Sequence, residues 1–278
     1  MMENKFPHKS FAKRISSMLK VDFKRLFLSR SFYIIVASCL VAPVLILVMV
    51  TMMDGTVSVN PQTGEETVME GFDNVWQIIG SVNDPNASAD MSAEGGAAMD
   101  MSITSMCNMN MLYFAIAALV CIFVADDFRS GYSKNLFTVR AKKTDYVASK
   151  TIVLIFGAMM MVLAFFIGSL IGGAVSGLPF DMVGFNAGNL IMCVLSKMLL
   201  VSVFVPIYLI MSVAAKEKLW LSIILSMMVG MFLFMMIPML TPLNATFVNV
   251  LLCTLGGAGF GVGLGAISNL VLKKTALV

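Results

Sequence analysis

Six long stretches of the chain are almost free of charged residues, and short polar segments separate them. They cover about residues 32–53, 105–125, 151–171, 190–214, 219–240 and 248–272. Each has about the 20 residues that an α-helix needs to cross the hydrocarbon core of a bilayer. Pro206 and Pro238 fall inside the fourth and fifth stretches and predict local helix breaks there. The pattern therefore predicts an all-α integral membrane protein with six transmembrane helices.

The segment before the first stretch, within residues 1–30, has a two-sided pattern. Its apolar side chains recur at helical spacing, at Phe11, Ile15, Met18, Leu19, Phe23 and Leu26, and its basic ones lie opposite, at Lys13, Arg14, Lys20, Lys24 and Arg25. This is typical of an amphipathic helix that lies in the headgroup plane of a membrane. Asp22 falls within the apolar arc. Either Asp22 faces a protein partner, or it is a single acidic residue at the edge of an imperfect stripe.

The distribution of charge orients the predicted spans. The first 30 residues carry eight basic and two acidic side chains, and residues 129–150 carry six further basic ones. Between Asp54 and Cys107 there are nine carboxylates and no Lys or Arg. Because short loops rich in Lys and Arg stay on the cytoplasmic side, residues 54–104 form a predicted extracellular loop. Six spans then place both termini in the cytoplasm.

The acidic loop is too long for a passive connection between two spans. Its middle, residues 71–82, contains Trp76, Ile78 and Ile79. We expect this part to form a short helix or strand that packs on the outer mouth of the helix bundle.

Composition agrees with a membrane protein and excludes several other classes. Hydrophobic residues make up 59% of the chain and the mean hydropathy is +0.90, whereas soluble domains have about 45–50% apolar residues. The net charge of +3 therefore says little about nucleic acid, and no nucleic-acid partner is expected; the basic residues are interpreted as topology determinants and contacts to lipid headgroups. Five scattered cysteines without a Cys-x-x-Cys pair, and one histidine, His8, in the basic tail, predict no metal site.

The segment after the second stretch carries the most specific motif. It reads Asp126-Asp127-Phe128-Arg129-Ser130-Gly131-Tyr132-Ser133-Lys134-Asn135-Leu136, and a basic stretch leads from there to Lys150. This pattern resembles the membrane subunits of ABC-2 type transporters, which have the type V exporter fold. In that family an acidic residue, an aromatic residue, a Gly-Thr/Ser-like turn and Lys/Arg-Asn-Leu precede the third span. Tyr132 stands where the family often has threonine.

The resemblance implies a coupling function for the cytoplasmic loop 126–150. A short helix of about residues 126–137 would insert into a groove on a cytoplasmic ATPase, with Phe128, Leu136 and Phe137 as anchors and Arg129 and Lys134 as the charged rim. The candidate coupling residues are Asp126, Asp127, Phe128, Arg129, Gly131, Lys134, Asn135 and Leu136. The alternative is a basic inner loop that only obeys the positive-inside rule.

The resemblance also implies partners. The chain has no Gly-x-x-x-x-Gly-Lys-Ser/Thr phosphate loop, so it is not expected to be an enzyme or to bind a cofactor itself. ATP and Mg²⁺ would be bound by a separate ABC ATPase subunit. A second permease copy, or a homologous permease subunit, would complete the pathway in a bacterial cell membrane. The expected activity is export of an amphiphilic or hydrophobic substrate, such as an antimicrobial peptide, a lipid-like compound or a drug.

Two features inside the spans are candidates for further functions. Lys197 lies within the fourth span, where it either snorkels or forms a structural pair, or lines a translocation cavity. Gly257, Gly261 and Gly265 are spaced four apart in the sixth span and predict a face for close helix packing.

Two other functions remain possible from the sequence. A non-transporting membrane protein, such as an immunity or sensor protein with an acidic external domain, would need no ATPase. A secondary transporter would need paired carboxylates within the membrane, and the predicted spans contain none.

Overall fold

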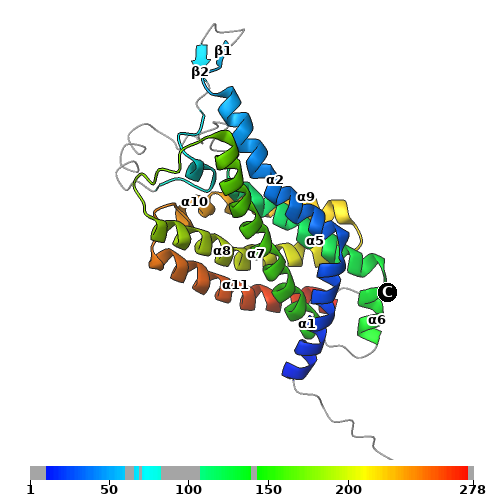
Figure 1. Cartoon of the computed structure of the whole chain (residues 1–278). Coiled ribbons are helices and arrows are strands. Elements are labelled where there is room, and N and C mark those ends of the chain that lie inside the picture. Colours follow the sequence, from blue (N-terminus) through cyan, green and yellow to red (C-terminus); the bar gives the residue numbers. More distant parts are fainter. Residues whose placement is uncertain (1–10, 60–65, 69–70, 83–106, 139–142, 275–278) are drawn as a thin grey trace, which may run out of the picture.

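The computed structural model describes residues 11–59, 66–68, 71–82, 107–138 and 143–274, which are almost entirely helical (Figure 1). The helices are α1 (Phe11–Leu28), α2 (Arg30–Met53), η1 (Val75–Ile78), η2 (Met109–Met111), α5 (Leu112–Arg129), α6 (Tyr132–Thr138), α7 (Lys143–Ser176), α8 (Ala187–Ala215), α9 (Leu219–Phe234), α10 (Met236–Leu240) and α11 (Phe247–Lys274). Strands β1 (Val57–Val59) and β2 (Glu66–Val68) pair antiparallel and project beyond the end of α2.

Five helical segments of the described residues are long and apolar enough to cross a membrane. They are α2, η2 with α5, α7, α8 and α11. The predicted fifth span is divided into α9, with 16 residues, and the short α10. The break precedes Pro238, whose ring nitrogen has no hydrogen to donate to the carbonyl of Phe234. The break predicted at Pro206 is wrong, because α8 continues through this residue.

Helix α7 extends far beyond the apolar stretch that predicts it. Its 34 residues give a length of about 50 Å at about 1.5 Å per residue, whereas the hydrocarbon core is about 30 Å thick. The additional turns, residues 143–150, carry polar side chains that are buried against α1 and the end of α5. Residues 143–150 of the predicted cytoplasmic loop 126–150 therefore form the beginning of α7.

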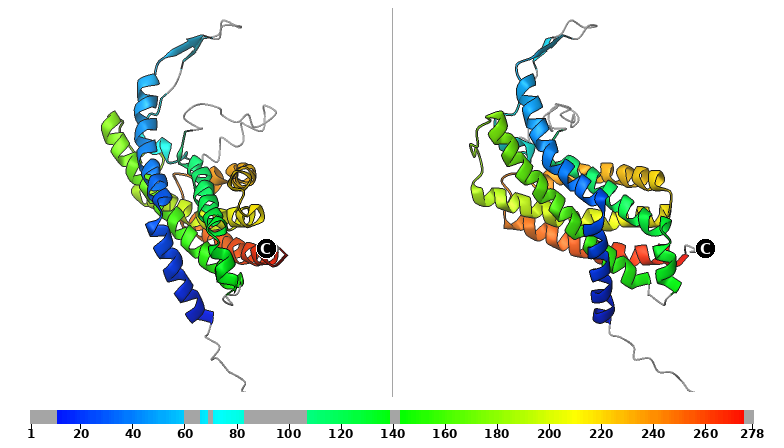
Figure 2. Two further views of the ribbon diagram at one scale, coloured as in Figure 1. Left: turned by 90° about the vertical axis from the view of Figure 1, so that its right-hand side faces the viewer. Right: turned by 45° about the vertical axis from the view of Figure 1, so that its right-hand side comes forward.

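Helices α5 and α8 form the centre of the bundle, and α2 and α11 lie at its periphery (Figures 1 and 2). Helix α7 packs along α2, and α11 packs along α8. Gly168 and Gly172 of α7 permit the first contact, since a Cβ atom on Gly168 would lie 2.1 Å from the backbone oxygen of Leu40. Close approach at small residues is the usual way in which helices pack within a membrane.

The two ends of the bundle differ. The basic end consists of α1, the end of α5, α6, the start of α7 and the turn at residues 216–218. Arg129 Nε donates a hydrogen bond of 3.3 Å to the Glu217 carbonyl in this turn. The opposite end is closed by residues 71–82, here called the plug, which contains η1. The buried plug residues are Phe72, Val75, Trp76, Ile78, Ile79 and Gly80. The short helix predicted there is confirmed.

Backbone and side-chain hydrogen bonds fix the plug to two neighbouring connections. Val75 N donates to Pro179 O (3.2 Å), Trp76 Nε1 to Phe180 O (3.1 Å) and Leu243 N to Ser81 O (2.8 Å). The plug is therefore part of the folded helix bundle.

Candidate coupling site at the basic end

Helix α1 presents a buried polar residue to the rest of the chain. Met18 and Leu26 are buried on the same face, while Lys20 and Lys24 are exposed. Asp22 lies on the buried face and is 0% exposed. Neither interpretation offered by the sequence holds, because Asp22 faces α7 of its own chain. Its Oδ1 atom lies 2.8 Å from Lys150 Nζ.

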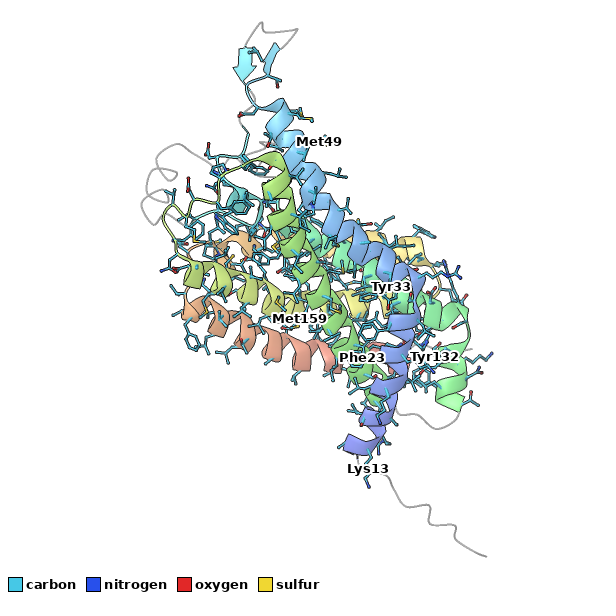
Figure 3. All side chains as sticks on the ribbon, in the orientation of Figure 1. Lys13, Phe23, Tyr33, Met49, Tyr132 and Met159 are labelled. Carbon is cyan, nitrogen blue, oxygen red and sulfur yellow. The ribbon has the colours of Figure 1, made fainter. Side chains whose placement is uncertain are left out.

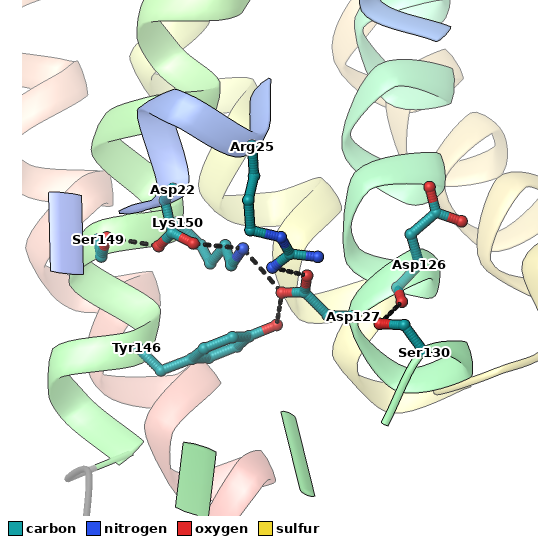
Figure 4. Close-up of polar contacts among 8 residues, drawn as sticks. All are labelled: Asp22, Arg25, Asp126, Asp127, Ser130, Tyr146, Ser149 and Lys150. Atoms are coloured by element: carbon teal, nitrogen blue, oxygen red, sulfur yellow. Dashed lines mark hydrogen bonds and ion pairs between the residues drawn. The ribbon is translucent and has the colours of Figure 1, made fainter. Parts of the chain in front are cut away.

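Asp22 belongs to a cluster of buried charges that joins three helices (Figure 4). Lys150 Nζ of α7 is 2.8 Å from Asp22 Oδ1 of α1 and 2.7 Å from Asp127 Oδ2 of α5. Arg25 Nη1 completes the cluster at 2.5 Å from Asp127 Oδ1. We call these four residues the charge cluster. Two carboxylates and two cations balance, and their mutual attraction offsets the desolvation penalty of burial only where hydrogen bonds complete the pairing.

Neutral hydroxyl groups complete the hydrogen bonding of the carboxylates. Ser149 Oγ donates to Asp22 Oδ2 at 2.6 Å, and Tyr146 OH donates to Asp127 Oδ2 at 2.8 Å. Both donors lie in the first two turns of α7: Tyr146 is four residues before Lys150, and Ser149 is directly before it. The start of α7 therefore supplies both a charge and the hydroxyl groups that orient the acidic partners.

Aromatic rings cover the cations of the charge cluster. Lys150 Nζ lies 4.2 Å from the ring centre of Phe123, and the guanidinium carbon of Arg25 lies 4.0 Å from that of Tyr132. These distances are typical of cation–π contacts. Figure 3 shows Tyr132 beside α1. Tyr132, which stands where the family often has threonine, thus has a structural function here, since its ring covers the guanidinium group that pairs with Asp127.

The pKa shifts of Arg25 and Tyr132 agree with a charged guanidinium and a neutral phenol. Burial lowers the pKa of the Arg25 guanidinium, but Asp127, with smaller contributions from Tyr132 and Asp22, raises the pKa above its ordinary value. Burial, and then the negative charge of Asp22, raises the pKa of Tyr132. Arg25 therefore stays charged and Tyr132 stays neutral across the physiological pH range.

A second ion pair ties α1 to α7, about two turns before Asp22 on α1 and more than one turn before Lys150 on α7. Arg14 Nε donates to Asp145 Oδ2 at 2.8 Å, and the Asp145 side chain is almost completely buried. Helix α1 is thus fixed to the start of α7 at two points along its length. A displacement of α7 or of the end of α5 must move α1 with it, or break buried ion pairs.

The predicted single coupling helix of residues 126–137 is instead two helices. Helix α5 continues to Arg129, and α6 begins at Tyr132. Gly131 separates them with φ of +68°, a left-handed conformation that glycine adopts without strain. Ser130 Oγ donates to the Asp126 carbonyl at 2.6 Å and so satisfies a carbonyl in the last turn of α5.

The candidate coupling residues divide into exposed and buried groups. The exposed ones are Asp126, Arg129, Lys134 and Asn135, and the half-buried ones are Phe128, Leu136 and Gly131. Asp127 is fully buried in the charge cluster, so it does not form part of the exposed surface. Phe128, Leu136 and Phe137 pack against the core of their own chain. The exposed surface for a partner is therefore formed mainly by polar and charged side chains.

Lys197 lies at the opposite end of the bundle and is also fully buried. Its ammonium group donates to Asn110 Oδ1 at 2.7 Å and to Thr241 Oγ1 at 2.9 Å. A Cβ atom on Gly80 of the plug would lie 3.9 Å from the same nitrogen. The side chain thus pairs with neutral oxygen atoms beneath the plug and does not snorkel to a surface.

The three candidate glycines of α11 have different surroundings. A Cβ atom on Gly257 would lie 1.8 Å from Ser202 Oγ, so this glycine permits close packing on α8. Cβ atoms on Gly261 and Gly265 would meet no atom within 4 Å. These two glycines do not take part in helix packing within a single chain.

Sequence reasoning missed most of the charge cluster. Asp22 was recognised as out of place, but Asp127 and Lys150 lie at the predicted ends of spans, where charged residues are common. Arg25 was assigned to the polar face of α1. One signal was present in the sequence: Asp22 and Lys150 are each a charge at the margin of an apolar surface.

These features define a polytopic helical membrane protein whose basic end is held together by buried ion pairs. The sequence profile of the family described as ABC-2 family transporter protein matches residues 18–233, which include the charge cluster and extend from α1 to α9. The chain therefore belongs to the ABC-2 transporter family, as the motif at residues 126–136 predicts. Comparison with curated proteins and with solved structures gives no significant match.

Proposed function

We propose that this chain is the membrane-spanning permease subunit of an ATP-driven ABC transporter. Helices α9 and α10 together form the fifth of six spans, and both termini and the basic end face the cytoplasm. An ABC ATPase subunit binds ATP and Mg²⁺ and docks on the exposed residues around α6. The observation that carries the proposal is the charge cluster, because it links this docking surface to α1, α5 and α7 as one mechanical unit.

Several properties of the cluster support transmission of movement. Asp127 lies next to the exposed Asp126 at the end of α5, so a force on the surface reaches a buried ion pair directly. Lys150 then connects α5 to α7, which runs the length of the bundle to the plug. ATPase closure would move α1 and the starts of these spans together.

The remaining half of the transporter would be a second copy of the chain or a homologous permease. Most of the α11 surface is not buried within the chain. Gly261 and Gly265 leave open space on this helix for the approach of another one. The alternative function, a membrane-bound immunity or sensor protein, predicts that the native particle contains no ATPase.

Charge reversal at Lys134 is expected to reduce co-purification of the ATPase by at least about tenfold, because like charges opposed at an interface cost several kcal/mol. The tagged chain is expressed with its genomic neighbours, and the ATPase retained by wild type and by Lys134→Glu is compared. Lys134 suits this test better than Phe128, which packs on its own core.

The matched control is Lys13→Glu, because Lys13 is an exposed lysine of α1, away from α6. This variant is expected to retain the ATPase. Absence of any ATPase from the wild-type particle would refute the proposed function. Equal losses in both variants would refute docking on α6.

We propose an amphiphilic or hydrophobic cargo, because the described spans expose mainly apolar side chains. An amphiphilic peptide is expected to stimulate ATP hydrolysis by the purified complex, and a sugar or an inorganic ion is not.

Lys197→Met tests whether this lysine contacts the cargo after the plug moves. Stimulation of ATP hydrolysis should fall, while the melting temperature of the complex stays within a few degrees. A complex that responds only to a sugar or an ion contradicts the cargo class, and unchanged stimulation in Lys197→Met removes the lysine from the pathway.

A further inference from the structure

An open groove lies between α1 and the end of α5 at the basic end. Its volume is about 690 Å³, and it is lined by Lys20, Val21, Lys24, Arg25, Leu28, Ser29 and Asp126. The lining comes mainly from the last two turns of α1 and from its junction with α2. The groove is thus located where an amphipathic helix meets a membrane span.

The charges that line the groove are mostly positive. Lys20, Lys24 and Arg25 contribute three cations, and Asp126 contributes one carboxylate. Among the described residues, the carboxylates that pair with cations elsewhere at this end are buried, and no salt bridge involves Lys20 or Lys24. Both lysines are exposed. Arg25 is balanced by Asp127 in the charge cluster, so Lys20, Lys24 and Asp126 leave the groove with a net charge of about +1 that no described residue neutralises.

Apolar side chains continue from the groove onto the membrane span. Val21 and Leu28 line the groove and are 47% and 70% exposed, and Tyr33 and Ile34 at the start of α2 are 56% and 65% exposed. A ligand that fits both surfaces needs an anionic head and long apolar chains. A soluble anion would leave the apolar surface in contact with water.

We propose that this groove binds the headgroup of an anionic phospholipid of the inner leaflet. Lys20 and Lys24 neutralise its phosphate, and its acyl chains lie against α2. The placement at the inner leaflet rests on the proposed function. Arg25 lines the groove and also pairs with Asp127, so a bound lipid stabilises the junction of α1 with α5 and the charge cluster behind it.

The test measures lipid retention by the full chain alone. The purified chain in detergent is incubated with equal amounts of phosphatidylglycerol and phosphatidylcholine with identical acyl chains, and native mass spectrometry counts the bound lipids. Wild type is expected to prefer phosphatidylglycerol. Lys20→Gln with Lys24→Gln is expected to weaken this preference about 25-fold, since each basic residue near an anionic lipid contributes a factor of about five.

The matched control, Lys13→Gln with Lys218→Gln, removes two exposed lysines of the same end that do not line the groove. It is expected to keep the preference. Equal losses in both double variants, an unchanged preference in the groove variant, or displacement of the lipid by millimolar inorganic phosphate would overturn the proposal. If the double variant does not fold, Lys24→Gln alone should show the fivefold effect. The measurement needs no ATPase, so its outcome is independent of the co-purification experiment.

Discussion

Replacing Lys150 with methionine is expected to lower the free energy of unfolding by about 3–5 kcal/mol, the usual cost of removing one partner from a buried ion pair. Lys150 lies between Asp22 and Asp127, and all three side chains are 0% exposed. Without the lysine, Asp22 loses the one cation among the described residues that forms an ion pair with it, and Asp127 retains Arg25. Equilibrium unfolding in mixed detergent and SDS micelles measures the change.

A second substitution separates the lost charge from the lost packing. Adding Asp22→Asn to Lys150→Met removes the uncompensated carboxylate, and the asparagine can still accept the hydrogen bond from Ser149. The double variant is therefore expected to regain part of the stability. Lys134→Met removes an exposed lysine and should change stability by less than about 0.5 kcal/mol. A Lys150→Met variant as stable as this control would show that the charge cluster does not hold the three helices together.

Replacing Gly168 with alanine is expected to cost about 3 kcal/mol or more, at the upper end of the usual cost of overpacking. The new Cβ atom would lie 2.1 Å from the Leu40 backbone oxygen and 2.7 Å from Pro43 Cγ. Neither a backbone oxygen nor a proline ring can turn aside, so α2 and α7 must separate along their contact. The same unfolding measurement detects the loss.

Gly261→Ala is the matched control for this prediction. Gly261 is also a helical glycine of a candidate span, but a Cβ atom there meets no atom within 4 Å. Alanine also has the higher intrinsic helix propensity. We expect no loss of stability in the isolated chain. Equal effects of the two substitutions would indicate that the approach of α7 to α2 is not as close as the structure shows.

The glycines illustrate why packing was hard to predict. Three glycines spaced four apart in the last span suggested a packing face, but only Gly257 contacts another helix of the chain. Gly168 and Gly172 have the same spacing and lie at the contact of α7 with α2. Spacing identifies a smooth helix face. It does not identify the face that another helix covers, because this depends on the arrangement of the whole bundle.

The coupling segment, residues 126–137, also shows what the sequence predicts and what it does not. The motif at residues 126–136 correctly predicted the family, but the single helix predicted over residues 126–137 is divided at Gly131. The sequence grouped Asp126 and Asp127 as candidate coupling residues, yet one is exposed and the other is fully buried. Successive residues of a helix point about 100° apart, so neighbours in a motif can have opposite environments.

By itself, the sequence determined that this protein is embedded in a membrane, which stretches are candidate spans, which loops are basic and to which family the chain belongs. These properties depend on the length, apolarity and charge of continuous segments. Only the tertiary structure decided that Asp22, Arg25, Asp127 and Lys150 form one cluster, that the plug closes over Lys197 and that α7 packs on α2 through Gly168. The physical reason is that a buried charge or a missing side chain is stabilised by groups from other helices, and the identity of those groups is set by how the helices pack.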